Sequence, residues 1–296
     1  MTRGKAALRA PAWPRRARGL AVRTALVSIA VAALGTGLFA SPAAGGGLEV
    51  ERATLDNGVQ LVLSTQQSVP IVAITCLIDG GARVDPAGKA GLADITGGLL
   101  SEGTTGRSSQ DIARLIDSLG GSFGTEAAAD WISASAMVLS RDFGTGLDLI
   151  ARSLKEPTFP QEEFDRERTE TLSEIKSAED DPGAVAGRTF RKAVFGDGPY
   201  GHAVDGTAEG VQSIKREDVV AFHRREILPG RTICAIVGDV PVAEMKAMAA
   251  KLLGSWKQSG EAKGVAPSSV PQARSLLVDM PISQANIVLG QVGVAR

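Results

Sequence analysis

The chain has 296 residues, of which 44% are hydrophobic, so it is long enough and apolar enough to bury a sizeable core, which excludes an intrinsically disordered protein. Only 4% of the residues are aromatic while 35 are glycine, which indicates a core of aliphatic and small side chains. The formal net charge of −1 conceals an asymmetry, because seven Arg and Lys residues precede the first acidic residue, Glu49.

Residues 1–43 have the features of a secretory signal peptide. The seven cations are followed by a mostly apolar run, Ala25 to Ala40, and then by Ser41-Pro42-Ala43, with small residues where signal peptidase cleaves. An uncleaved anchor is the alternative, although the run is shorter than the about 20 residues that span a bilayer comfortably. Cleavage removes all seven cations and no acidic residue, so nucleic acid and anionic membrane surfaces are poor partners. We therefore predict an exported, periplasmic or extracellular protein that meets a membrane only through this segment, if it stays uncleaved.

The first elements after the signal segment are predicted from turn and periodicity signals. Asn57-Gly58 between two apolar stretches predicts a hairpin of two strands. An amphipathic helix is predicted to begin at Ser108 or Ser109 and to end at Gly120, because the intervening apolar residues follow helical spacing. The alternation of side chains from Trp131 to Val138 is typical of a strand that is packed on one face.

The rest of the chain interleaves helices and strands without regular βαβ repetition. The spacing of apolar residues predicts helices over residues 143–154, 161–178, 213–227 and 242–253, and strands over residues 71–78 and 232–237. This order favours an α+β domain, a mostly antiparallel mixed sheet with helices packed on one face. We place that domain at 44–254, a polar linker with Gly and Pro at 255–275, and a strand-like segment that begins another unit at 276–296.

Cys76 and Cys234 lie in two of these strand-like runs. In an exported protein they could form a disulfide. The alternative is a pair of buried thiols that act as small hydrophobic side chains. The sequence leaves both states open.

The segment from Asp79 to Thr104 carries a series of short motifs: Gly81-Ala82-Arg83, Asp85-Pro86, Gly91-Leu92-Ala93, Leu99-Leu100 and Gly103-Thr104. The series resembles the core signature of the pitrilysin/insulinase family of zinc peptidases, in its mitochondrial-processing-peptidase-like branch. The segments 198–214 and 236–240 also resemble family landmarks. The resemblance implies a peptidase-like α+β domain followed by the beginning of a truncated second domain of the same kind, so the chain is expected to be a piece of a two-domain protein.

Active members of that family carry His-x-x-Glu-His after the third motif. On a helix the two His lie on one face and bind Zn²⁺, while the Glu acts as general base on the metal's water. Here Asp94, Gly97 and Gly98 stand at these positions, so the motif is degenerate and no catalytic residue is assigned. Two adjacent Gly each cost a helix about 1 kcal/mol relative to Ala, so the segment is expected to be weak, with a bent or irregular helix as one outcome.

The resemblance also implies a third zinc ligand, a Glu further along the chain with a second Glu two turns before it. Glu174 and Glu167 match these positions and are vestigial candidates for metal ligands. The alternative is that both belong to a solvated acidic stripe at helical spacing. The only two histidines, His202 and His223, lack metal-ligand spacing; we expect a loop contact for His202 and a surface or half-buried position for His223. No cofactor is predicted for this chain, whereas active relatives use zinc.

Three functions follow from this reading. The first, which the resemblance favours, is a non-catalytic subunit that pairs with an active peptidase subunit of the same family in peptide or protein processing. The second is a stand-alone structural or peptide-binding protein of the same fold. The third, an active metalloendopeptidase that uses Asp94, Glu167 and Glu174, is the weakest, because carboxylates alone favour hard ions over zinc. Activity of the chain alone is therefore not expected.

Residues 121–138 are the candidate for peptide recognition. Active relatives hold extended peptides by strand addition at a sheet edge, and small residues such as Ala129, Ser133 and Ser135 would let another backbone approach. The alternative is an interior strand whose small side chains fit under helices.

Overall fold

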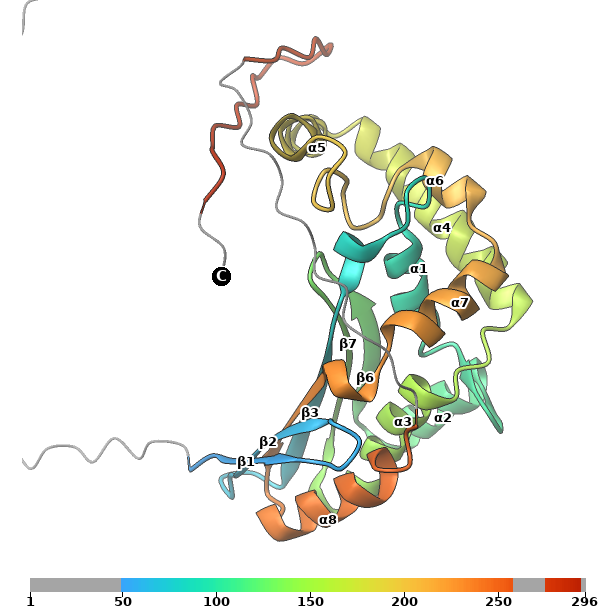
Figure 1. The fold of residues 1–296 in the computed structure, drawn as a ribbon, viewed down its shortest axis with the longest axis vertical. Helices are drawn as coiled ribbons and strands as arrows, with labels where there is room; N and C mark the ends of the chain where they lie inside the picture. The colour runs from blue at the N-terminus through green and yellow to red at the C-terminus, as the bar shows by residue number, and fades with distance from the viewer. Residues whose placement is uncertain (1–48, 258–274, 294–296) are drawn as a thin grey trace, which may run out of the picture. The chain divides into compact units, whose positions relative to one another are not determined.

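The computed structural model describes residues 49–257 and 275–293, so the predicted signal peptide and most of the predicted linker lie outside the described residues. One six-stranded sheet has the order β1-β2-β8-β3-β7-β6 (Figure 1). Its strands are β1 (Glu51–Thr54), β2 (Gln60–Thr65), β3 (Ile71–Asp79), β6 (Ser122–Ala127), β7 (Trp131–Leu139) and β8 (Thr232–Gly238). Neighbours are antiparallel except the parallel pair β2 and β8. The predicted mostly antiparallel mixed sheet is confirmed.

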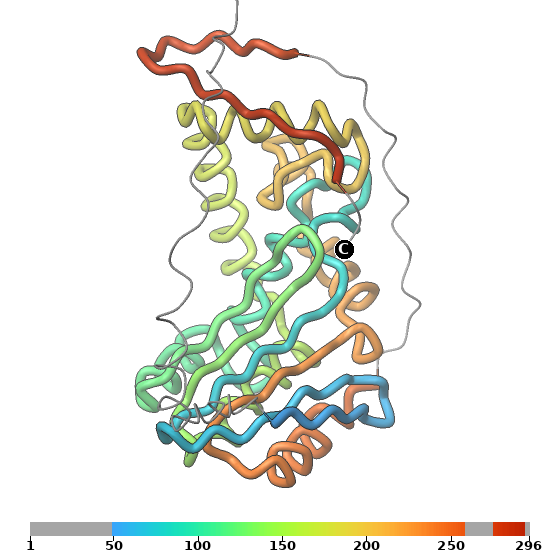
Figure 2. Tube along the Cα trace, turned by 90° about the vertical axis from the view of Figure 1, so that its left-hand side faces the viewer, coloured from blue at the N-terminus to red at the C-terminus, as the bar shows by residue number. Residues whose placement is uncertain are grey.

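The helices lie on one face of this sheet (Figure 1), and the view onto the opposite face shows its strands without a covering helix (Figure 2). They are α1 (Leu92–Leu99), α2 (Ser109–Leu119), α3 (Phe143–Lys155), α4 (Gln161–Glu179), α5 (Pro182–Phe195), α6 (Ala208–Ser213), α7 (Arg216–Glu226) and α8 (Val242–Leu253). The 3₁₀ turns η1 (Gly81–Val84), η2 (Ser140–Asp142) and η3 (Pro229–Arg231) and a small ladder of β4 (Gly103–Thr104) and β5 (Arg107–Ser108) complete the described elements. The α+β class is therefore confirmed.

Local signals account for the elements that were predicted correctly. Gly58 adopts a positive φ of 92° in the turn between β1 and β2. The Ser108 side chain accepts a hydrogen bond from the backbone N–H of Asp111, whose carboxylate accepts one in return from the Ser108 N–H, and this capping box begins α2. Gly120, with φ 61°, ends the same helix in the left-handed region.

Side-chain alternation places the core between the sheet and its helices. In β3 the inward residues Val72, Ile74, Cys76 and Ile78 are all buried. Their outward neighbours on the uncovered face include exposed apolar side chains, among them Leu77 and, on β7, Met137. The period of two therefore divides each strand between a packed face and an open face.

Cys76 and Cys234 form a disulfide that joins β3 to β8. The two residues are direct partners in the antiparallel register, and neither side chain is exposed. The bond closes a sequence separation of 158 residues. Of the two states left open by the sequence, the structure therefore has the disulfide.

Two expectations about secondary structure were wrong, and one further helix was missed. The helix predicted from Ser213 begins at Arg216, because residues 208–213 form the separate helix α6. The helix α5 was not predicted at all. Residues 275–293 contain no strand, because no residue of this segment pairs with another backbone in a ladder. Among the described residues no helix is long and apolar enough to cross a membrane.

Candidate functional site

The degenerate motif lies on α1, and Asp85 holds the beginning of that helix. The carboxylate of Asp85 accepts hydrogen bonds from the backbone N–H groups of Gly91 and Ala93, both at 2.8 Å. Burial raises the pKa of Asp85 to about 7, although these two N–H groups favour the charged form. The Asp-Pro motif therefore serves to fix the start of α1.

The second family landmark packs on the same helix start. A Cβ placed on Gly91, whose φ is 100°, would lie 2.8 Å from the carbonyl oxygen of Asp205. A Cβ on Gly210 would lie 2.6 Å from the carbonyl oxygen of Ala90. Only glycine permits this close backbone approach. The segments around residues 91 and 206, far apart in sequence, thus form one structural unit.

Residues Leu92–Leu99 form the α-helix α1 without a break, so the irregular helix that the two glycines allowed is not what the structure shows. Six of its eight residues are buried, and this packing outweighs the low helix propensity of two adjacent glycines. The positions that would carry two imidazoles and a base are consequently held in helical geometry.

Asp94 and Gly98 face α4, where the two vestigial candidates lie. A Cβ on Gly98 would be 2.5 Å from Oε1 of Glu167. Burial, and then the nearby charges of Asp205 and Glu174, raise the pKa of Asp94 to about 6. Burial, followed by the charge of Asp94, raises the pKa of Glu167 to about 7. The structure therefore places Glu167 against Gly98, and both Glu167 and Glu174 near enough to Asp94 to interact with its charge.

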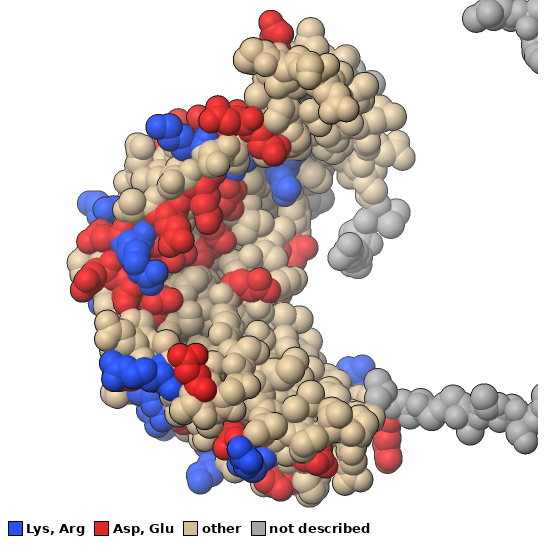
Figure 3. Space-filling model, turned by 180° about the vertical axis from the view of Figure 1, so that it is seen from behind, with Lys and Arg blue, Asp and Glu red and all other residues tan. Residues whose placement is uncertain are grey.

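The two glutamates differ in exposure. Glu174 is exposed, whereas Glu167 is half-buried against Gly98, so only part of the expected acidic stripe is solvated. Acidic side chains gather on this side of the molecule (Figure 3), and Arg166 pairs there with both Glu102 and Glu163 at 2.8 Å.

In the described part of the chain no group of three or more His, Cys, Asp or Glu is placed to hold a metal. With one carboxylate and two glycines in the motif, these residues do not fit a zinc site of the His-x-x-Glu-His kind.

Gly97 packs against the edge strand β6. A Cβ there would lie 2.9 Å from both the backbone N of Ala127 and the carbonyl carbon of Glu126. These atoms belong to the backbone, so they cannot move aside as the end of a side chain can. The position at which the resemblance places the general base of active relatives is thus in close contact with the backbone of β6.

β6 is the edge of the sheet, whereas β7 lies between β6 and β3. The prediction of an exposed edge over residues 121–138 is therefore right for β6 and wrong for β7, where Ser133 and Ser135 have partners on both sides. The Ala128 N–H donates to the Trp131 carbonyl at 2.8 Å, so Ala128 faces β7. Because the N–H groups of an antiparallel strand face its neighbour at every second residue, the N–H of Thr125, three residues earlier, faces away from β7. A pocket of about 480 Å³ lies beside Phe123, between α2 and Arg166.

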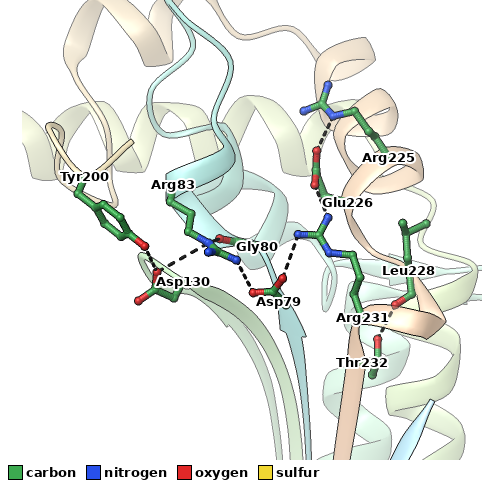
Figure 4. Close-up of polar contacts among 10 residues, drawn as sticks. All are labelled: Asp79, Gly80, Arg83, Asp130, Tyr200, Arg225, Glu226, Leu228, Arg231 and Thr232. Carbon is green, nitrogen blue, oxygen red and sulfur yellow. Dashed lines mark hydrogen bonds and ion pairs between the residues drawn. The ribbon is translucent and has the colours of Figure 1, made fainter. Parts of the chain in front are cut away.

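An ion-pair network joins the ends of several elements near this edge (Figure 4). Arg83 pairs with Asp79 at the end of β3 and lies 3.7 Å from Asp130 in the turn after β6. The Tyr200 hydroxyl donates to Asp130 at 2.7 Å. The nearly buried Arg231 links Asp79, at 3.4 Å, to Glu226 on α7, at 2.6 Å. The Arg of the Gly-Ala-Arg motif is thereby explained as a structural residue.

Comparison with known families agrees with this geometry. The family model described as insulinase (peptidase family M16) matches residues 61–208, half of the chain, and the model described as peptidase M16 inactive domain matches residues 213–296. The chain belongs to the insulinase family. The resemblance seen in the motifs from Gly81 to Thr104 is therefore confirmed.

Relatives within the insulinase family include proteins named as zinc proteases. An uncharacterized zinc protease of Mycobacterium leprae is 32% identical over 204 residues, which cover 69% of this chain and 46% of the relative. One from Streptomyces coelicolor is 28% identical over 257 residues, covering 83% of this chain and 55% of the relative. The chain spans about half the length of the curated relatives it matches.

Solved structures of insulinase-family proteins share the fold. The peptidase M16 inactive domain from Pseudomonas fluorescens superposes with a TM-score of 0.72 at 26% identity, covering 76% of this chain and 55% of the other. The periplasmic protease PqqL from Escherichia coli gives a TM-score of 0.67 at 16% identity, covering 75% of this chain and 25% of the other. At 16% identity the second match shows the fold alone.

The two histidines of this insulinase-family chain are not part of the motif region. His223 is buried, at 5% exposure, so the expectation of a surface or half-buried imidazole was wrong. Its Nε2 bonds to the Leu154 carbonyl at 2.8 Å, which satisfies the imidazole inside the core. His202 contacts the neighbouring Ala203 carbonyl at 2.8 Å in the loop, as predicted. Arg231 was missed, because no local pattern distinguishes an arginine that pairs inside a fold.

Proposed function

We propose that this chain is an exported, non-catalytic member of the insulinase family that pairs with an active zinc peptidase of the same family in peptide or protein processing. The observation that carries the proposal is the contact of α1 with its neighbours. Backbone of β6 fills the space at Gly97, and Glu167 fills the space at Gly98. No imidazole is present on this helix, so α1 supplies no histidine ligand for a zinc ion that would activate a water molecule.

Retained features support a role in binding. The β6 edge presents the Thr125 N–H outward, so an extended peptide could extend the sheet through backbone hydrogen bonds. The pocket beside Phe123 is lined in part by Ile112, Ala113 and Ile116, which would accept an apolar side chain of that peptide. A second candidate function, a stand-alone peptide-binding protein, rests on this edge and needs no partner.

Export is supported by two independent features. The predicted signal peptide, residues 1–43, directs the chain out of the cytoplasm. The disulfide between Cys76 and Cys234 belongs to oxidising compartments, because cytosolic thiol systems keep most cysteines reduced.

The test combines metal analysis with reconstitution. After dialysis the protein should hold no stoichiometric zinc, and alone it should not cleave a quenched fluorescent peptide. Mixed with an intact-motif relative encoded by the same organism, it should form a heterodimer in analytical ultracentrifugation and raise the peptide cleavage rate. One tightly bound zinc ion per chain would contradict the non-catalytic assignment. Peptide binding without any heterodimer would favour the stand-alone candidate.

A further inference from the structure

A second pocket, remote in sequence from the degenerate motif, is lined by basic residues. It has a volume of about 290 Å³ and lies between the end of α3, the loop that follows it, and α7. Lys155, Arg216 and Arg224 contribute three cations, and no acidic residue lines it. In a chain with slightly more acidic than basic residues, this is a local concentration of positive charge.

Two of these cations donate hydrogen bonds to uncharged groups, which leave their positive charges unpaired. Arg216 donates from Nη2 to the Thr158 carbonyl at 3.0 Å and from Nε to the Phe159 carbonyl at 2.5 Å. Lys155 donates to the Leu252 carbonyl at 2.8 Å and to a serine hydroxyl at 3.0 Å. The exposed Arg224 has no ion pair among the described residues, and neither do the other two cations. The carbonyl groups orient two of the cations but leave all three charges available.

The wall of the pocket contains a strained residue. Phe159 is the single non-glycine residue of the described ranges with a positive φ, at 45°, and its side chain is buried. Its ring meets His223 edge to face, with 5.5 Å between the ring centroids. Backbone strain of this kind persists where the surroundings fix it, and it concentrates at functional sites. The two hydrogen bonds from Arg216 to the carbonyl groups of this loop stabilise its strained backbone. The same two bonds hold the Arg216 guanidinium in place before a ligand binds.

We propose that this pocket binds a phosphate group, either free or carried by a small molecule. Its volume is at the lower end for small-ligand sites, which suits a compact anion. Guanidinium groups match phosphate oxygens with paired donors, and the Arg224 guanidinium has no hydrogen-bond partner within residues 49–257 and 275–293. Three cations without a carboxylate favour a dianion over a single carboxylate. The site uses none of the residues of α1 or β6, so it goes beyond the proposed function and stands independently of it.

The test measures binding of inorganic phosphate by calorimetry, with acetate at matched ionic strength as the competing anion. Phosphate should bind and acetate should not. Arg224→Gln should weaken phosphate binding at least tenfold while the melting temperature without phosphate stays unchanged, because this side chain is exposed and without an ion pair. The matched control is Arg52→Gln, which removes the same charge from an exposed arginine on β1 and should leave phosphate affinity unchanged.

Nuclear magnetic resonance gives a second readout, because the chain has only two histidines. Phosphate should shift the imidazole signals of His223, which lines the pocket, and leave those of His202 in place. The proposal is overturned if phosphate produces no more heat or shift than acetate. It is equally overturned if Arg52→Gln and Arg224→Gln weaken binding to the same extent, since the effect would then reflect net charge alone.

Discussion

Replacing Asp94 and Gly98 together with histidine should create a zinc site on this fold. Both positions face α4 on a regular helix, and Glu174 lies close enough to Asp94 to raise its pKa. Two imidazoles at i and i+4 with a glutamate from a neighbouring helix make three protein ligands, the number in catalytic zinc sites. Zinc binding by the variant Asp94→His/Gly98→His therefore tests whether α1 and α4 place these three side chains close enough to share one metal ion.

The free-energy cost of replacing a glycine by a larger residue is expected to differ sharply between Gly98 and Gly97. At Gly98 a new Cβ meets Oε1 of Glu167 at 2.5 Å, and this flexible side chain can turn aside. At Gly97 a new Cβ meets backbone atoms of β6 at 2.9 Å, so a larger residue should cost the about 1–3 kcal/mol typical of overpacking. We expect the double histidine variant to fold normally, and the triple variant with Gly97→Glu to melt lower by several degrees, at roughly 2–4 °C per kcal/mol.

The assay is zinc content after dialysis together with thermal unfolding with and without zinc. At a free zinc concentration 100 times the dissociation constant, the double variant should gain about 2.7 kcal/mol. Adding Glu174→Gln should abolish that gain, whereas adding Glu167→Gln should preserve it. If the double variant binds no more zinc than the parent chain, the inferred register of the two helices is wrong. If Glu174→Gln makes no difference, the third-ligand assignment fails.

Three further outcomes are expected. Replacing Cys76 and Cys234 by Ala should lower the free energy of unfolding in urea by up to about 5 kcal/mol, because the lost bond closes a loop of 158 residues; an unchanged midpoint would contradict this. The pKa values of Asp94, about 6, and Glu167, about 7, lie above their ordinary values, so the folded state binds these protons more tightly than the unfolded state. Their contribution to the free energy of unfolding is therefore complete below about pH 4 and is lost as the pH rises through 6–7. The melting temperature should therefore fall between about pH 4 and 7, and fall less in Asp94→Asn/Glu167→Gln; equal slopes would refute the assignment. Thr125→Pro removes an outward edge donor and should weaken peptide binding in calorimetry, whereas equal affinity in a folded variant would exclude the β6 edge.

Much of the fold could be predicted from local sequence patterns. The Asn57-Gly58 turn, the Ser108 cap and the alternation in β7 each rest on interactions between residues close in sequence, and each predicted the observed element. The failures lie where tertiary contacts decide. The glycines of α1 predicted a weak helix, but burial of most of its residues makes it regular. The segment after residue 275 has strand-like composition, yet in the described residues it pairs with no strand.

The sequence by itself determined the family, and it places Asp94, Gly97 and Gly98 where the resemblance expects His-x-x-Glu-His, because both inferences depend on which residues stand at fixed spacings in a short motif. The same resemblance predicts that Glu167 and Glu174 are vestigial ligand positions. Only the tertiary structure decided what now fills the site, since backbone of β6 and the Glu167 side chain reach α1 from other parts of the chain. The disulfide and the basic pocket between α3 and α7 likewise arise from residues far apart in sequence, whose proximity is set by packing of the whole sheet and its helices.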